Sequence, residues 1–159
     1  MTSKLLTTWS EYDAATQEIL DRSTATLEIF DEDLSSLKLE RASRIAALRA
    51  LLDSHRYPRR VTIVVRKADF VRQSCPQLMK LLRVHAPALT ITESPPHLGT
   101  PEASLLIADG RYALVRFHRD LARARLIVED TGESAPFLQR FNEIVAAGGE
   151  PLSPTTLGL

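Results

Sequence analysis

The chain has 159 residues, of which 44% are hydrophobic and 25% are charged, as in ordinary globular proteins. Its formal net charge is zero at pH 7, which excludes bulk charge as a source of attraction to nucleic acid or membrane. The length predicts a single domain over residues 1–159, with residues 150–159 as a C-terminal tail. A lone cysteine, Cys75, excludes an intramolecular disulfide, and we find no signal peptide or membrane span, so we expect a cytoplasmic protein.

The charge is unevenly distributed along the chain. Residues 56–125 carry 13 basic and 5 acidic residues, a net charge of +8, whereas residues 1–55 and 126–159 each carry −4. Of the 20 basic residues, 16 are arginine, whose planar fork suits phosphate. Codon usage in a GC-rich genome also produces an excess of arginine over lysine, and it is the simpler explanation of this composition.

The first half of the chain predicts a β-α-β unit. A helix begins at Ser10 as N-cap, and residues 25–30 alternate in polarity as a half-buried strand does. Apolar residues recur at helical spacing over 41–53, and residues 61–65 form a continuous β-branched run. Such a run suits a strand that is buried on both faces, so we expect residues 25–65 to hold two parallel strands joined by a helix.

The second half predicts further strands and helices around a hairpin. Asp109-Gly110 lies between two apolar runs, a strong signal for a tight turn. The other expected elements are a helical stretch over 69–86 that restarts at Pro76, a weak strand over 89–92, a proline-rich loop over 93–101, a strand over 126–128, and a last helix capped by Ser134.

The segment 111–125 is the densest concentration of basic residues and the predicted anion-binding site. On a strand, Arg116 and His118 share one face and project together. The alternative is a solvated loop whose arginines pair with acidic neighbours. The candidate residues are Arg111, Arg116, His118, Arg119, Arg123 and Arg125.

Metal and nucleophile chemistry lack a sequence signature. The histidines share no short spacing, so we expect no metal and no cofactor. Cys75 lies in a leucine-rich helical region, which predicts a small buried apolar side chain rather than a nucleophile.

The order of these elements, and the segment Leu105-Leu-Ile-Ala-Asp-Gly-Arg-Tyr-Ala-Leu-Val115, resembles a phospholipase D superfamily half-domain. The resemblance implies an α/β fold with a mixed β-sheet flanked by helices, and half-domains that commonly pair as dimers. In that family a His-x-Lys pair, an Asp separated from it by four residues, and a downstream Gly-Ser and Asn form the site, with the histidine as nucleophile.

Aligned on Asp109, the family motif is degenerate here. The histidine position falls on Glu102 and the lysine position on Ser104, while the asparagine position falls on Asp120. The Gly-Ser positions fall on Arg116 and Phe117. Without the His-Lys pair the phosphohistidine mechanism cannot be written, so the resemblance implies a protein that is not an enzyme.

The whole chain also resembles a bacterial family of unknown function related to this superfamily. The shared features are Trp9, the segment Leu27-Glu-Ile-Phe-Asp-Glu-Asp-Leu34, Cys75-Pro-Gln-Leu78, the Phe137/Phe141 helix and Thr156-Leu-Gly-Leu159.

Three functional hypotheses remain open. The first is a non-catalytic interaction or regulatory domain that acts as a homodimer or through a protein partner. The second is a module that binds an anionic ligand, phosphate or nucleic acid, through the arginine-rich segment. The third is an enzyme of unrecognised type built on Glu102, Asp109, His97 and His118.

Overall fold

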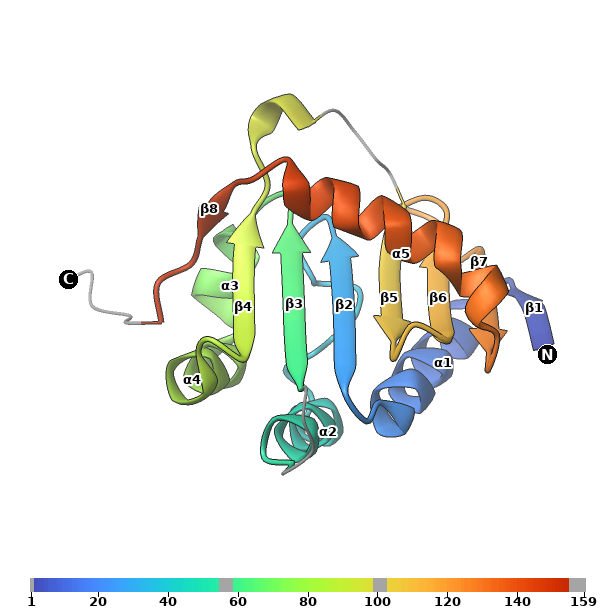
Figure 1. Ribbon diagram of the computed structural model, residues 1–159, viewed down its shortest axis with the longest axis horizontal. Helices are drawn as coiled ribbons and strands as arrows, with labels where there is room; N and C mark the ends of the chain where they lie inside the picture. The colour runs from blue at the N-terminus through green and yellow to red at the C-terminus, as the bar shows by residue number, and fades with distance from the viewer. Residues whose placement is uncertain (1, 55–58, 99–102, 155–159) are drawn as a thin grey trace.

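A computed structural model describes residues 2–54, 59–98 and 103–154, and it contains one eight-stranded mixed sheet with the strand order β1-β7-β6-β5-β2-β3-β4-β8 (Figure 1). The strands are β1 (Thr2–Leu6), β2 (Thr26–Asp31), β3 (Arg60–Val65), β4 (Leu89–Glu93), β5 (Ser104–Ala108), β6 (Tyr112–Arg116), β7 (Ala124–Val128) and β8 (Glu150–Pro151). The helices are α1 (Trp9–Arg22), α2 (Ala42–Leu52), α3 (Asp69–Ser74), α4 (Pro76–His85), the short 3₁₀ helix η1 (Pro96–Leu98) and α5 (Thr131–Ala146).

The predicted β-α-β unit is confirmed, because β2 and β3 are parallel and α2 connects them. Strand β4 continues the parallel set beside β3, and β5 joins the other side of β2 in antiparallel orientation. Strands β5 and β6 form the predicted hairpin around Asp109-Gly110. The carboxyl ends of β2, β3, β4 and β6 therefore lie at one end of the sheet, at the top in Figure 1.

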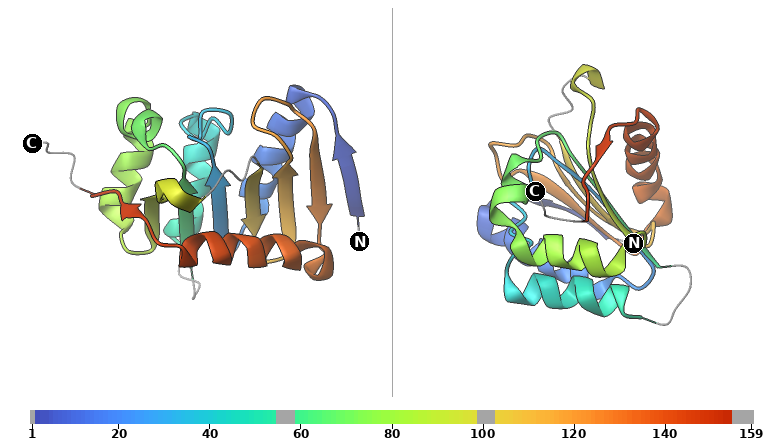
Figure 2. Two further views of the ribbon diagram at one scale, coloured as in Figure 1. Left: turned by 90° about the horizontal axis from the view of Figure 1, so that it is seen from above. Right: turned by 90° about the vertical axis from the view of Figure 1, so that its left-hand side faces the viewer.

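The two faces of the sheet are covered unequally (Figure 2). Helices α1 to α4 pack on one face, where Leu27, Ile29 and Ile63 belong to the larger core cluster. Helix α5 crosses the other face alone, and its Phe141 and Ile144 pack against Phe30 and other strand residues in a smaller cluster. None of the helices in the described ranges is long and apolar enough to cross a membrane.

The N-terminal cap of α1 differs from the prediction. The cap is Thr8, whose hydroxyl accepts a hydrogen bond from the Glu11 N–H at 3.1 Å, and the Glu11 carboxylate accepts one from the Thr8 N–H at 3.2 Å. This is a capping box two residues earlier than expected from Ser10. Trp9 consequently begins the helix rather than joining the core, and it stays 45% exposed.

Three further corrections concern the last helix and the chain ends. Asp130 caps α5, while Ser134 lies buried within the helix. The strand β1 was not expected from the sequence, and it pairs antiparallel with β7. Part of the predicted tail forms β8 on β4, where a Cβ on Gly149 would lie 2.4 Å from the Glu93 carbonyl oxygen.

Candidate functional site

Asp109, the residue on which the family motif was aligned, ties the β5–β6 hairpin to the start of β2. Its carboxylate accepts hydrogen bonds from the N–H groups of Thr24, Ala25 and Thr26 at 2.8 to 3.0 Å, and from the Thr24 hydroxyl at 3.0 Å. Partial burial opposes its ionisation, but these donors outweigh that effect and lower the pKa of Asp109. The residue also adopts φ of 56° beside Gly110, as the tight turn requires.

At the opposite end of the hairpin, Ser104 and Arg116 are register partners. The Ser104 hydroxyl donates to the Phe30 carbonyl oxygen at 3.3 Å, within the sheet. Arg116 is 1% exposed, and its Nη2 lies 3.1 Å from Asp31 Oδ1 while its Nη1 donates to the His118 carbonyl at 2.9 Å. Its Nε finds no hydrogen-bond partner among the described residues. The position aligned with the family lysine is thus part of a buried, largely satisfied polar cluster.

Two aromatic rings of α1 enclose this buried ion pair. The Arg116 guanidinium carbon lies 5.2 Å from the centre of the Tyr12 ring and 5.4 Å from that of Trp9. Burial raises the pKa of Tyr12, so its phenol stays protonated beside Arg116. The guanidinium therefore has aromatic faces on one side and a carboxylate on the other, which is a favourable setting for a buried arginine.

A second layer of charge surrounds a small hollow above the ion pair. Glu32 lies 3.2 Å from Arg66, 3.7 Å from Lys67 and 3.6 Å from Arg119. The hollow has a volume of about 290 Å³, and it is lined by Asp31, Glu32, Asp33, Ser35, Ser36, Arg116, Arg119 and Asp120. Four carboxylates and two arginines line it, so its charge is not that of a phosphate site.

The structure separates the predicted anion-binding residues. Arg111 lies at the turn, 5.3 Å from the Tyr112 ring, at the other end of β6 from Arg116. Arg125 belongs to β7 rather than to the expected loop, and it lies 3.6 Å from Glu133. We expected Arg116 and His118 to project together, but the Arg116 side chain is buried. Anion binding by this segment remains a prediction that depends on the exposed Arg119, Arg123 and Arg125.

The remaining candidates are dispersed. Glu102 falls outside the described residues, and His97 is exposed on η1. The His118 Nδ1 accepts a hydrogen bond from the Asp120 N–H at 3.2 Å. Within the described ranges, no three His, Cys, Asp or Glu residues are grouped as a metal site requires.

Cys75 is 2% exposed, and burial raises the pKa of its thiol to about 12. A thiol in this state carries almost no thiolate at neutral pH, so it is a poor nucleophile. Its predicted role as a small buried apolar side chain is confirmed.

Sequence reasoning missed one buried acid, Glu28 on β2. It is 6% exposed beneath α5, and its Oε1 has no hydrogen-bond partner among the described residues. Burial raises the pKa of Glu28 to about 7, with Asp109 adding to the rise and Arg60 opposing it. The alternation over residues 25–30 could have placed Glu28 on the face opposite Leu27, but not under a helix.

No protein-family model matches the chain, and no curated protein matches its sequence. Solved structures do resemble it. The archaeal chromatin protein TrmBL2 superposes with a TM-score of 0.67 at 14% identity, over 94% of this chain and 54% of that one. The chain therefore spans about half the length of TrmBL2.

Two further solved structures resemble the chain over almost its whole length. Nuc, a phospholipase D family member from Salmonella typhimurium, has a TM-score of 0.59 at 11% identity, over 95% of this chain and 99% of that one. NucT from Helicobacter pylori has a TM-score of 0.54 at 8% identity, over 94% and 98%. At these identities the similarity establishes the architecture alone: the chain has the phospholipase D-like α/β fold, with a mixed sheet flanked by helices.

Proposed function

We propose that this chain is a non-catalytic phospholipase D-like domain with an interaction or regulatory role. The observation that carries the proposal is the use of the motif positions. Ser104, in place of the lysine, hydrogen-bonds within the sheet, and Asp109 accepts four hydrogen bonds that hold the hairpin. The positions that carry the motif in active relatives are engaged here in maintaining the fold.

The chemistry of the neighbouring groups supports the same proposal. A serine hydroxyl supplies no positive charge to a phosphate, and Arg116, its register partner, is already paired with Asp31. The described histidines are dispersed: His85 ends α4 and lies 3.3 Å from Asp53, His97 is on η1, and His118 follows β6. A nucleophile with an oriented base is therefore not apparent among the described residues.

The test is a set of phosphodiesterase assays on the full chain with a chromogenic diester, single-stranded and double-stranded DNA, and phosphatidylcholine vesicles. We expect no turnover above the no-protein background. Robust turnover that disappears in Glu102→Ala, with an unchanged unfolding curve, would overturn the proposal.

We also propose that two copies of the chain associate through the β1 side of the sheet. Leu5 on β1 is 51% exposed, and Phe117 and Leu121, in the loop that joins β6 to β7, are 43% and 58% exposed. The loop that carries two of them also holds Arg119 and Asp120, so a two-fold axis near this loop brings opposite charges together. Large apolar side chains among charges of both signs fit a self-complementary contact.

Light scattering coupled to size-exclusion chromatography tests this association. The wild-type chain should have the mass of a dimer, and Phe117→Ser/Leu121→Ser should have the mass of a monomer. Val84→Ser removes an apolar side chain on α4 that is 64% exposed, and it should leave the dimer intact. A wild-type monomer at all concentrations would contradict the pairing.

A further inference from the structure

A larger cavity lies beside the buried ion pair, between the first turns of α1 and the segment that follows β2. Its volume is about 460 Å³, within the range of small-molecule sites. Besides the paired Asp13 and Arg41, the residues that line it are Trp9, Ser10, Tyr12, Ser35, Ser36 and Lys38.

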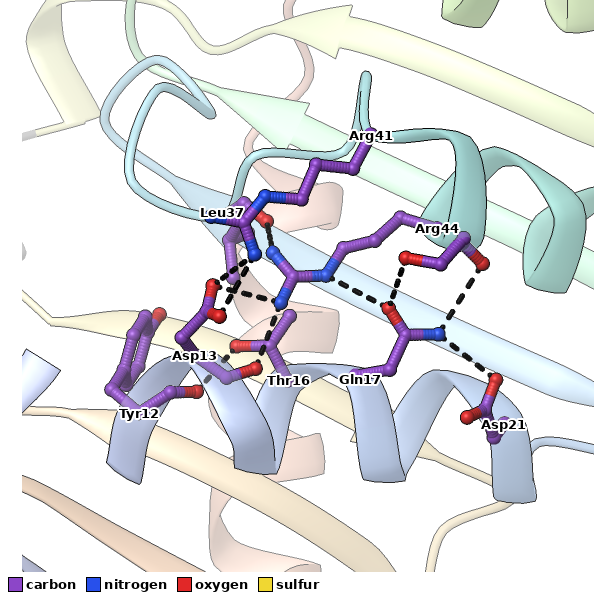
Figure 3. A network of polar contacts seen from close by, with 9 residues as sticks. Tyr12, Asp13, Thr16, Gln17, Asp21, Leu37, Arg41 and Arg44 are labelled. Carbon is purple, nitrogen blue, oxygen red and sulfur yellow. Dashed lines mark hydrogen bonds and ion pairs between the residues drawn. The ribbon is translucent and has the colours of Figure 1, made fainter. Parts of the chain in front are cut away.

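The wall of this cavity is fixed by a network of polar contacts (Figure 3). Arg41 binds both oxygens of the Asp13 carboxylate, at 2.9 and 2.8 Å. Arg44 is 1% exposed, and it donates to Asp13 Oδ1 at 2.9 Å and to the Leu37 carbonyl at 2.6 Å. These bonds join α1, α2 and the segment 35–41, so the cavity is held open before any ligand arrives.

The same network neutralises the acid on the cavity rim. Partial burial opposes ionisation of Asp13, but the hydrogen bonds and charges of Arg41 and Arg44 outweigh it and lower its pKa. One carboxylate faces two arginines, so the rim does not repel an anion. Lys38 adds a further positive charge, and no described carboxylate forms an ion pair with it.

Trp9 gives the cavity a flat aromatic surface. Its ring meets Tyr12 edge to face, with centroids 5.7 Å apart and an interplanar angle of 89°, which fixes its orientation. Arg116 lies against the ring, yet the side chain remains 45% exposed. An ordered, half-exposed tryptophan at the mouth of a cavity offers a stacking surface for a planar ring.

We propose that this cavity binds a small planar organic anion, whose ring stacks on Trp9 and whose carboxylate or phosphate binds Lys38. The hydroxyl groups of Ser10 and Ser36 lie in the same lining and can donate to the anion. Aromatic carboxylates and nucleoside monophosphates share this chemistry. The proposal does not depend on the absence of catalysis.

The adjacent cavity limits the length of the ligand. It shares Ser35 and Ser36 with the larger cavity, but four carboxylates line it against two arginines. A ligand with several phosphates would extend towards these carboxylates and be repelled. The site therefore favours a single ring with one anionic group over a nucleic-acid strand.

Trp9 is the only tryptophan in the sequence, so its fluorescence reports on this cavity directly. Titrations of the full chain with AMP and with benzoate should show a saturable change in fluorescence for at least one of them. The anion that causes the change shows whether the ligand is a nucleoside monophosphate or an aromatic carboxylate. The matched neutral compounds, adenosine and benzamide, should bind about tenfold more weakly or not at all, because the charged contact is lost. Inorganic phosphate should change the fluorescence little.

Substitutions of single residues test which side chains contact the anion. Lys38→Gln should weaken binding of the responding anion about tenfold. Lys80→Gln removes the same charge from an exposed position on α4 and should bind as the wild type does. Trp9→Phe, measured by calorimetry, should weaken binding by a smaller factor because a smaller ring remains.

Three outcomes would overturn the proposal. They are no saturable response to either anion, equal affinity of Lys38→Gln and Lys80→Gln, and equal affinity of the neutral and charged compounds. Lys38 is exposed, so its substitution leaves the fold intact, and matching unfolding curves verify this.

Discussion

Each end of β2 has a carboxylate, and the two carboxylates are stabilised in different ways. At its start, Asp109 reaches from the hairpin and accepts hydrogen bonds from donors of Thr24, Ala25 and Thr26, with solvent nearby. At its end, Asp31 is 1% exposed and pairs with Arg116, which is equally buried. The first arrangement uses neutral donors to stabilise one charge, and the second places two charges in the interior.

The difference shows which end is under greater constraint. The free-energy cost of ionising a carboxylate is small when it has backbone donors and access to solvent. A buried ion pair, in contrast, is stable only while both partners remain. Asp31 also accepts the Leu34 N–H at 2.7 Å, so the pair holds the segment that lines both cavities. The carboxyl end of β2 is therefore the end where a single substitution should have the largest effect.

The largest expected effect comes from breaking the buried pair. Arg116→Met leaves the Asp31 carboxylate buried without its cation and should cost about 3–5 kcal/mol of unfolding free energy. The double variant Asp31→Asn/Arg116→Met should lose less than the sum of the single variants, by about 1–3 kcal/mol. Urea unfolding measures both, and strict additivity would show that the ion pair contributes nothing.

At the start of β2, Asp109→Asn keeps a residue that tolerates positive φ but replaces two acceptor sites with an amide NH₂. We expect a loss of about 2 kcal/mol at neutral pH. Because the folded pKa is lowered, this contribution is present above the unfolded pKa and disappears as the pH falls through the folded value. Unfolding curves of the two proteins should therefore converge in acid, and a constant difference would contradict the assignment.

Glu28 lies midway along β2, and its behaviour should be opposite to that of Asp109. Its folded pKa of about 7 lies above the unfolded value of 4.5, so wild-type stability should fall as the pH rises between these values and then level off. Glu28→Gln should remove this fall and be more stable by about 3 kcal/mol above pH 8. Thermal unfolding over the pH range measures the difference, which should vanish in acid.

The smallest expected effect concerns the first turn of α1, which carries Trp9 and Tyr12 against Arg116. Thr8→Ala removes the capping box and should cost about 1 kcal/mol. Ser10→Ala, at the position where the sequence suggested the cap, should change stability by only a few tenths of that. Equal losses in the two variants would show that the cap is not at Thr8.

Much of the fold could be predicted from local pattern. The β-branched run at 61–65, the helical spacing over 41–53 and the Asp-Gly turn each identify their element without reference to the rest of the chain. Strand β1 could not be found this way, because Thr2–Leu6 becomes a strand only through its pairing with β7. The candidate site was harder to predict, since Asp31 and Arg116 are 85 residues apart in the chain.

The sequence by itself determined the α/β architecture, the parallel unit around β2 and β3, and the tight turn at Asp109-Gly110. These follow from residue types and short-range periodicity, which act within a few residues of each position. Only the tertiary structure decided that Arg116 is a buried partner of Asp31 rather than an exposed anion ligand, and that Trp9 borders a cavity. Burial and ion pairing depend on which distant segments are in contact, and no local sequence pattern encodes those contacts.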